Sequence, residues 1–280
     1  MMPPGAASDL PKYEKPPVIE AVCGIQFKPL RKLLVPHFGE LWGRYKPKYS
    51  KCQEAAPLTP TIERLSEVPG TDIQVAPELL LPRVWFVHQD GNGVIQVQRD
   101  RFLHNWRKAK PEDDYPHYES VISLFREHYN TFVEFLTDNE LGTIEPLQYE
   151  MTYVNHILRG DGWHDPEDFS TVFPDFPWHS NEPWLTEQRR FLSIPNGRNL
   201  RVHFDLPNKS GRLHVTIRDG LLVEDQRPLL ILELTVRGIG QDKSAEAMQS
   251  WFNLAHVWIV RAFADLTGKE IQDNTWRRIR

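Results

Sequence analysis

The fold is decided first by residues 83–102, which read RVWFVHQDGNGVIQVQRDRF. Two runs rich in β-branched and aromatic residues, 84–87 and 94–97, flank the turn-forming tetrapeptide Asp90-Gly91-Asn92-Gly93. Turn residues between two such runs are typical of an antiparallel hairpin, so this stretch predicts two paired strands.

Helices and further strands extend outward from the hairpin. Apolar residues at three- and four-residue spacing predict amphipathic helices over residues 35–45, 118–136 and 244–266. Ser244 suits the N-terminal cap of the last helix. Runs of strand-forming residues predict the remaining strands at residues 18–27, 147–157, 190–194, 200–206, 212–218 and 229–236. The sequence therefore predicts an α+β fold, with antiparallel sheets covered by long amphipathic helices.

The order of these elements suggests how the chain is divided. In each half, antiparallel strands precede one long helix, so the fold is expected either to contain two similar strand-then-helix halves or to form one continuous domain. The expected segments are a flexible leader (1–15), an N-terminal α+β half (16–158), a Trp/Pro-rich connection (159–187), a C-terminal meander plus helix (188–270) and a basic tail (271–280). Prolines make residues 47–82 an irregular connection with short extended pieces.

Composition limits the classes of function. Hydrophobic residues make up 40% of the 280 residues, which is enough for a sizeable core. The net charge of −5 does not favour a broad nucleic-acid or anionic-membrane surface. Only two cysteines occur, and no membrane-length apolar stretch or secretory signal is found. These features predict a cytoplasmic protein that has no contact with a membrane.

A polar cluster around the hairpin is the most distinctive group of side chains. Gln96, Arg101, Asn105, Trp106 and Arg107 could hold a polar ligand, because arginine pairs with carboxylate or phosphate and tryptophan offers a stacking surface. The favoured interpretation is structural, with these residues closing a strand-to-helix corner.

Glu20 lies in an otherwise apolar predicted strand, so its carboxylate must face solvent or be paired. If Glu20 faces inward and meets an arginine such as Arg107, the pair would be a candidate site.

Motifs that carry known chemistry are missing. His156, Asp161, His164 and Asp165 are close in sequence, but they match neither a HExxH nor a paired CxxC pattern. GxSxG and phosphate-binding loops do not occur either. The sequence therefore predicts no metal site, no cofactor and no catalytic residue. The lone His256 is expected to be a structural residue.

Several motifs together resemble those of a known family. They are Pro16-Pro17-Val18-Ile19-Glu20, then residues 95–102 with Asn105-Trp106-Arg107, then Tyr115-Pro116-His117-Tyr118-Glu119 and Tyr153-Val154-Asn155. In these segments the chain resembles a sporadically distributed family of uncharacterised prokaryotic proteins of similar length. The resemblance implies no particular reaction, cofactor or catalytic residue. A patchy distribution often accompanies mobile or defence-type systems.

The leading functional hypothesis is a non-enzymatic binding protein that acts as a protein-interaction or accessory subunit. Its partner would be another protein or a second copy of the chain, and tryptophans are typical of such contacts. The expected interface residues are Trp163, Trp178 and Trp184, and the expected binding residues are Glu20, Gln96, Arg101, Asn105, Trp106, Arg107, Tyr118 and Asn155.

Two alternatives stay open. The first is a small-molecule binder or cryptic enzyme with a pocket between the sheet and the C-terminal helix. The second is a nucleic-acid-binding accessory protein that uses arginines such as Arg101 and Arg107. The net negative charge makes this second alternative the less favoured one.

Overall fold

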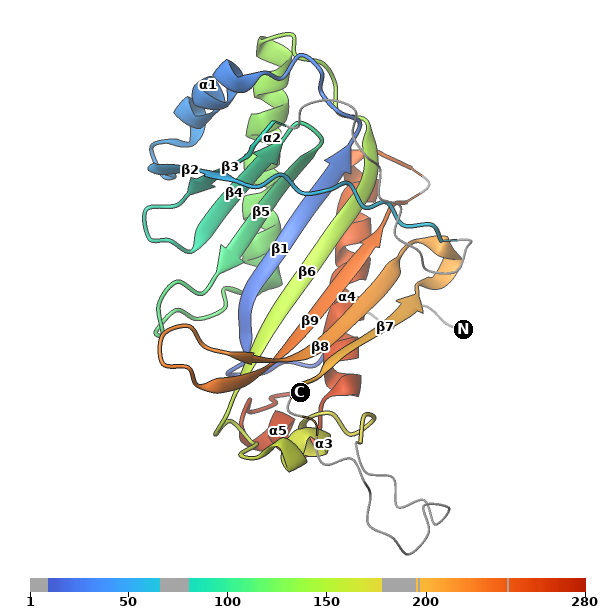
Figure 1. Cartoon of the computed structure of the whole chain (residues 1–280). Coiled ribbons are helices and arrows are strands. Elements are labelled where there is room, and N and C mark those ends of the chain that lie inside the picture. Colours follow the sequence, from blue (N-terminus) through green and yellow to red (C-terminus); the bar gives the residue numbers. More distant parts are fainter. Residues whose placement is uncertain (1–9, 66–80, 178–194, 196, 241) are drawn as a thin grey trace, which may run out of the picture.

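The structure, a computed structural model of the chain, describes residues 10–65, 81–177, 195, 197–240 and 242–280. Within these residues the strands form one nine-stranded antiparallel sheet in the order β2-β3-β4-β5-β1-β6-β9-β8-β7 (Figure 1). The strands are β1 (Val18–Phe27), β2 (Lys51–Ala55), β3 (Arg83–Val87), β4 (Gly93–Gln98), β5 (Arg101–Arg107), β6 (Pro146–Leu158), β7 (Asn199–Asp205), β8 (Arg212–Leu221) and β9 (Pro228–Gly238). β1 and β6 pair at the centre of the sheet, so distant parts of the chain meet there.

Two long helices cover one face of this sheet. The helices are α1 (Val35–Tyr45), α2 (His117–Asp138), α3 (Phe169–Val172), α4 (Ala245–Leu266) and α5 (Lys269–Asn274), with short 3₁₀ turns at η2 (Pro166–Asp168) and η3 (Pro207–Lys209). In Figure 1, α2 and α4 lie behind the sheet. α2 contacts β1 and β5, whereas α4 contacts β6 and β9. On this one face, α2 therefore covers the β1 side of the central pair of strands and α4 covers the β6 side.

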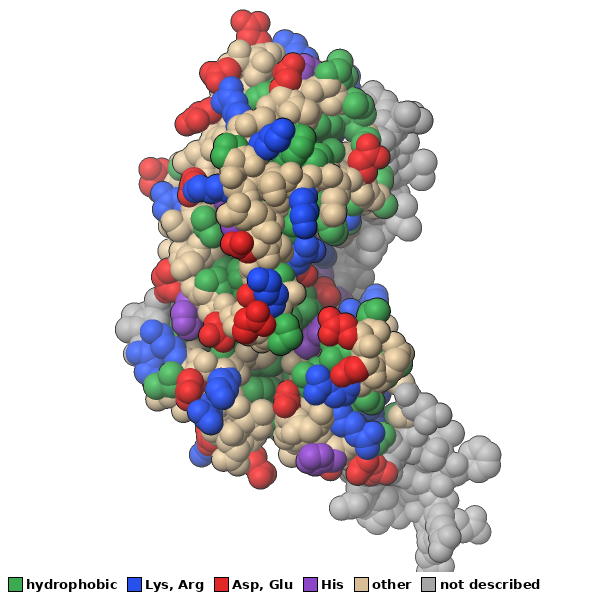
Figure 2. All heavy atoms as spheres, turned by 90° about the vertical axis from the view of Figure 1, so that its left-hand side faces the viewer, with side chains coloured by type: hydrophobic (Ala, Val, Ile, Leu, Met, Phe, Trp, Pro, Cys, Tyr) green, Lys and Arg blue, Asp and Glu red, His purple; other side chains and the backbone are tan. Residues whose placement is uncertain are grey.

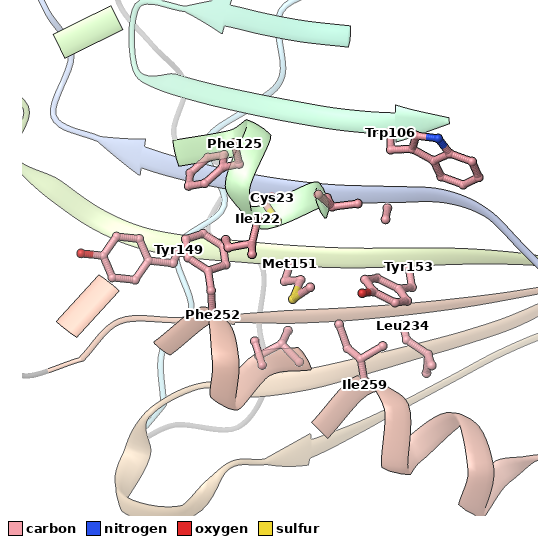
Figure 3. Packing of buried hydrophobic residues seen from close by; sticks show 14 of the residues in the cluster. Cys23, Trp106, Ile122, Phe125, Tyr149, Met151, Tyr153, Leu234, Phe252 and Ile259 are labelled. Atoms are coloured by element: carbon pink, nitrogen blue, oxygen red, sulfur yellow. The ribbon is translucent and has the colours of Figure 1, made fainter. Parts of the chain in front are cut away.

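The hydrophobic core fills the space between the sheet and these helices. Cys23 of β1 and Met151 of β6 are opposite each other in the central pair, and both are fully buried (Figure 3). Phe125 of α2 meets Phe252 of α4 with 5.0 Å between the ring centroids. This contact sets the spacing of α2 and α4. Full burial of one such side chain stabilises a fold by about 1.5–3 kcal/mol.

The opposite face of the sheet is crossed by residues 56–64, which we call the strap (Figure 1). The Gln98 side chain accepts a hydrogen bond from Leu58 N (2.8 Å) and donates one to Leu58 O (3.0 Å). Gln148 Oε1 accepts a hydrogen bond from Glu63 N (2.8 Å). Because the buried glutamines satisfy backbone groups of the strap, a segment without strand or helix structure is held in place there.

The two ends of the described chain also pair with each other. Tyr13 forms an isolated antiparallel bridge with Arg278, and Ile279 N donates to Lys12 O (2.8 Å). Residues 10–15, which were expected to belong to a flexible leader, are therefore bound to the C-terminal tail, and residues 1–9 lie outside the described part of the chain.

The α+β class predicted from the sequence is confirmed, but two details differ. The strands form a single sheet, which runs across the boundary expected near residues 159–187. Asn105, Trp106 and Arg107 lie on β5, not at a strand-to-helix corner, because the chain turns back at residues 99–100 and pairs Arg101 with Gln98. β2 and α5 were not predicted from the sequence. The strand expected at residues 190–194 lies outside the described residues.

Candidate functional site

The predicted polar cluster forms a hydrogen-bonded ladder across four neighbouring strands. Asn105 Nδ2 donates to Glu20 Oε1 (2.6 Å), and Gln96 Nε2 donates to Asn105 Oδ1 (2.8 Å). Arg83 Nη1 in turn donates to Gln96 Oε1 (2.8 Å). Because these groups satisfy one another, the ladder joins β1, β5, β4 and β3 and leaves few bonds for a ligand.

The expected pairing of Glu20 with Arg107 is not formed in the described structure. The two residues are cross-strand neighbours on β1 and β5, but Arg107 Nε donates to Gly91 O (2.9 Å). Arg101 lies 3.3 Å from the neighbouring carboxylate of Asp100. Both arginines are thus engaged locally.

Two tryptophans of the prediction are packed inside the protein: Trp106, a predicted binding residue, and Trp163, a predicted interface residue. Trp106 is buried on the helix side of β5. Trp163 is also buried, and its indole donates to Ile157 O (3.1 Å). Trp178 and Trp184 lie outside the described residues. Neither Trp106 nor Trp163 therefore presents its ring to solvent as a contact surface.

A cavity of about 800 Å³ lies on the helix side of the sheet, and we call it the interhelical cavity. It is bounded by α2, α4, the central strands, residues 10–13 and Ile279. Its apolar lining includes Val18, Ile122, Leu234, Val257, Val260 and Phe263. Of the residues predicted from the sequence, Tyr118 and Asn155 reach this cavity.

Pro16 and Val18 of one motif that carried the family resemblance line the interhelical cavity, and two further motif segments meet there. Tyr115, Tyr118 and Glu119 come from the first segment, and Tyr153 and Asn155 come from the second. These segments are distant in sequence, and they come together because α2 starts beside the centre of the sheet, where β6 lies. His117 has a positive φ of 64°, which turns the chain sharply into α2.

A hydrogen-bonded chain of one buried and two half-buried side chains crosses the inner wall of the cavity. The hydroxyl oxygens of Tyr115 and Tyr153 are 2.6 Å apart, and the Tyr153 hydroxyl lies 3.1 Å from His256 Nδ1. Burial lowers the pKa of His256 to about 4, so its imidazole is neutral at pH 7. Burial also raises the pKa of Tyr153, which keeps its hydroxyl protonated.

The His256 ring is held by a stacked tyrosine and by the hydroxyl bonded to its Nδ1. The Tyr118 ring stacks on it with 4.1 Å between centroids and 7° between planes. Tyr118 also donates a hydrogen bond from its hydroxyl to Asn253 Oδ1 (2.7 Å), which ties α2 to α4. The imidazole is therefore fixed in position before any ligand arrives, which reduces the entropic cost of binding.

Asn155 has unused hydrogen-bonding capacity. Its Nδ2 donates to Leu232 O (3.0 Å), but its Oδ1 has no partner among the described residues. The side chain is only 1% exposed. This oxygen exposes less than 1 Å² of surface, so it is an unpaired acceptor of the core that a molecule in the cavity does not reach.

A second, smaller pocket of about 330 Å³ lies between α2 and β4–β5, and we call it the His104 pocket. Tyr49, His88, His104 and His128 line it. Burial lowers the pKa of His104 to about 3 and that of His128 to about 4. The Nδ1 atoms of His104 and His128 have no hydrogen-bond partner in the described structure.

The described residues contain no group of three or more His, Cys, Asp or Glu side chains arranged to hold a metal ion. His156 and His164, which are close to Asp161 and Asp165 in sequence, lie on β6 and in the loop that follows it.

The outer surface carries mixed charges. Figure 2 shows Lys and Arg side chains interspersed with Asp and Glu over the face that it presents. That face therefore offers no extended basic surface of the kind that binds nucleic acid through its phosphates. Among the helices that the structure describes, none is both long and apolar enough to cross a lipid bilayer.

Sequence reasoning found part of the interhelical cavity. Tyr118, Asn155 and the tyrosine motifs were selected, whereas His256 was expected to be structural because it stood alone between apolar residues. The missing information was the register that brings α4 over β6.

Comparisons with family models, curated proteins and solved structures gave no match for the chain.

Proposed function

We propose that the protein binds a small molecule in the interhelical cavity. The observation that carries this proposal is a cavity of about 800 Å³ whose mostly apolar wall contains the hydrogen-bonded chain of Tyr115, Tyr153 and His256. Ligand sites in proteins are typically concave and mostly apolar, with a few fixed polar groups that orient the ligand.

The size of the cavity supports a ligand the size of a metabolite or drug. Such sites usually have volumes of about 300–1,000 Å³. The charged residues that line this cavity, Lys12, Glu119 and Arg126, are solvent-exposed and lie at its rim. The inner wall therefore favours an apolar body, and charged substituents would remain near solvent.

The sheet order supports a further part of the proposal, namely two similar halves that meet at the cavity. The first half runs from β1 through β5 to α2, and β5 pairs back with β1. The second half runs from β6 through β9 to α4, and β9 pairs back with β6. On this interpretation the ligand would bind where the halves join, a common location for binding sites.

A neutral fluorescent dye tests the proposal. 1-Aminoanthracene fluoresces more strongly in apolar surroundings, and we expect saturable binding with one site per chain. Val257→Trp should fill the cavity and weaken dye binding at least about tenfold, because the added ring occupies the space of the dye. Ser250→Trp is the matched control, since Ser250 is exposed on the same helix and does not line the cavity.

The result that would refute the proposal is an absence of saturable dye binding by the native protein. Equal dye binding by the native protein and a folded Val257→Trp variant would also refute it. Circular dichroism and thermal melts of both variants would show whether they are folded.

The protein-interaction hypothesis remains a second proposal only for the segment with Trp178 and Trp184, which lies outside the described residues. If Trp178→Ala and Trp184→Ala leave every detected association unchanged, this second proposal fails.

A further inference from the structure

The hydroxyl chain determines which nitrogen of His256 carries the proton. If Tyr115 donates to Tyr153 and Tyr153 donates to His256 Nδ1, every hydroxyl proton in the chain has an acceptor. If the direction were reversed, the Tyr115 proton would have no described acceptor, and leaving a donor unpaired in a buried site is costly. The favoured direction makes Nδ1 an acceptor and places the hydrogen on Nε2.

His256 Nε2 is therefore a hydrogen-bond donor on the cavity wall. The described residues provide no acceptor for it. Because stacking on Tyr118 and the bond at Nδ1 hold the ring in place, this donor is preorganised for a group on the ligand.

Asn155 lies on the same side of the sheet but gives a ligand no contact. It lies two residues after Tyr153 on β6, so the two side chains share a face of the strand. Its Nδ2 is bound to Leu232 O, and its Oδ1 exposes less than 1 Å² of surface. His256 Nε2 is therefore the atom on which the ligand chemistry depends.

The inner wall of the cavity carries no ionised group that would pair with a charged ligand. His256 faces the ring of Tyr118 and the hydroxyl of Tyr153, and both tyrosines remain protonated because burial raises their pKa. The carboxylate of Glu119 acts on His256 from the exposed rim. A charged head group placed inside would lose its hydration without gaining a counter-ion.

From these observations we infer that the interhelical cavity takes an uncharged, largely apolar molecule with a carbonyl group. The carbonyl oxygen accepts a hydrogen bond from His256 Nε2. This inference rests on the proposed function, because it specifies the ligand chemistry of the same cavity.

Three matched ring compounds test the inference, each by its ability to displace 1-aminoanthracene. 2-Quinolone and 1-methyl-2-quinolone have a ring carbonyl, and naphthalene has none. We expect both quinolones to bind about two- to tenfold more tightly than naphthalene, because one lost hydrogen bond removes about 0.5–1.5 kcal/mol.

Variants assign the contact to its residue. His256→Phe should weaken both quinolones to the level of naphthalene and leave naphthalene unaffected. His256→Gln keeps a side-chain N–H near the position of Nε2, and we expect it to restore part of the affinity.

The outcomes separate this inference from the proposed function. If the dye does not bind, the proposed function itself fails. If the dye binds but the three compounds displace it equally, or 2-quinolone does not displace it, only the inference is overturned. Equal weakening of all three compounds by His256→Phe would also overturn it, because His256 would then be only structural. If His256→Phe does not fold, the compound series on the native protein and on His256→Gln decides the question.

Discussion

The interhelical cavity and the His104 pocket each contain a buried neutral histidine, but the two sites treat it differently. In the cavity, His256 Nδ1 lies 3.1 Å from the Tyr153 hydroxyl, which is itself bound to Tyr115. In the pocket, the Tyr49 hydroxyl lies 3.4 Å from His104 Nε2, and His104 Nδ1 has no described partner.

This difference shows why a lowered pKa alone does not identify a functional histidine. Burial lowers the pKa in both sites. Only His256 combines a fixed tautomer, a stacked ring and a cavity of about 800 Å³, against about 330 Å³ for the His104 pocket. We therefore assign ligand binding to the first site and core packing to the second.

The largest predicted effect is on acid stability and concerns His104. Its pKa of about 3 in the folded protein lies below the usual value of 6.5, so the unfolded chain binds the proton first. Stability from this group is therefore complete above pH 6.5 and is lost as the pH falls toward 3. The full loss is on the order of 4–5 kcal/mol, at about 1.4 kcal/mol per pKa unit.

His104→Leu should remove this dependence, because leucine fills a similar volume without titrating. Urea unfolding at pH 7 and pH 4 should show a flatter dependence in the variant than in the native protein. The same pocket is also lined by His128, His88, Tyr49 and Lys48, which are unchanged in the variant. Exposed His164→Leu is the control, and an unchanged pH slope in His104→Leu would contradict the prediction.

A medium effect is predicted when the two tyrosines that contact these histidines lose their hydroxyls. Tyr153→Phe should destabilise the fold by about 1–3 kcal/mol, because Tyr115 and His256 both lose a buried partner. Tyr49→Phe should cost less than about 1 kcal/mol, since its contact with His104 is long. Urea titrations would measure the loss in free energy of unfolding for each variant, and equal losses would contradict the distinction between the two sites.

The smallest predicted effect concerns the charged rim of the interhelical cavity. Lys12→Ala and Arg126→Ala should each change the affinity for 1-aminoanthracene by less than about twofold, because exposed charges are screened by solvent and salt. Fluorescence titration at low and physiological salt would measure this change. A tenfold loss in either variant would contradict the prediction, because binding of the neutral dye would then depend on a charge at the rim.

The elements of the fold were largely predictable because their patterns are local. The strand at residues 18–27 and the helices starting near residues 35 and 245 match β1, α1 and α4, and the Ser244 side chain caps α4 as expected. β5, the strand that follows the predicted hairpin, was not predicted, because the two-residue turn before it is hard to recognise in the sequence. The merging of all strands into one sheet depends on long-range pairing of β1 with β6, which no local pattern encodes.

The site was predictable only in part for the same reason. Gln96 and Asn105 were expected to belong to one polar cluster and Glu20 to meet an arginine, whereas in the structure Asn105 bonds to both Gln96 and Glu20. Tyr118 and Asn155 were selected without a common location. His256 joins them through the packing of α4 over β6, and its chemistry is set by burial that appears only in the folded chain.

The most direct test is NMR of the protein labelled with ¹⁵N at its histidine rings and titrated with 2-quinolone, with His256 assigned from the His256→Gln variant. The account predicts an Nε2-protonated His256 whose ring signals move on titration, while those of His104 and His128 stay in place. Movement at His104 or His128 with none at His256 would contradict the assignment of the ligand site to the interhelical cavity.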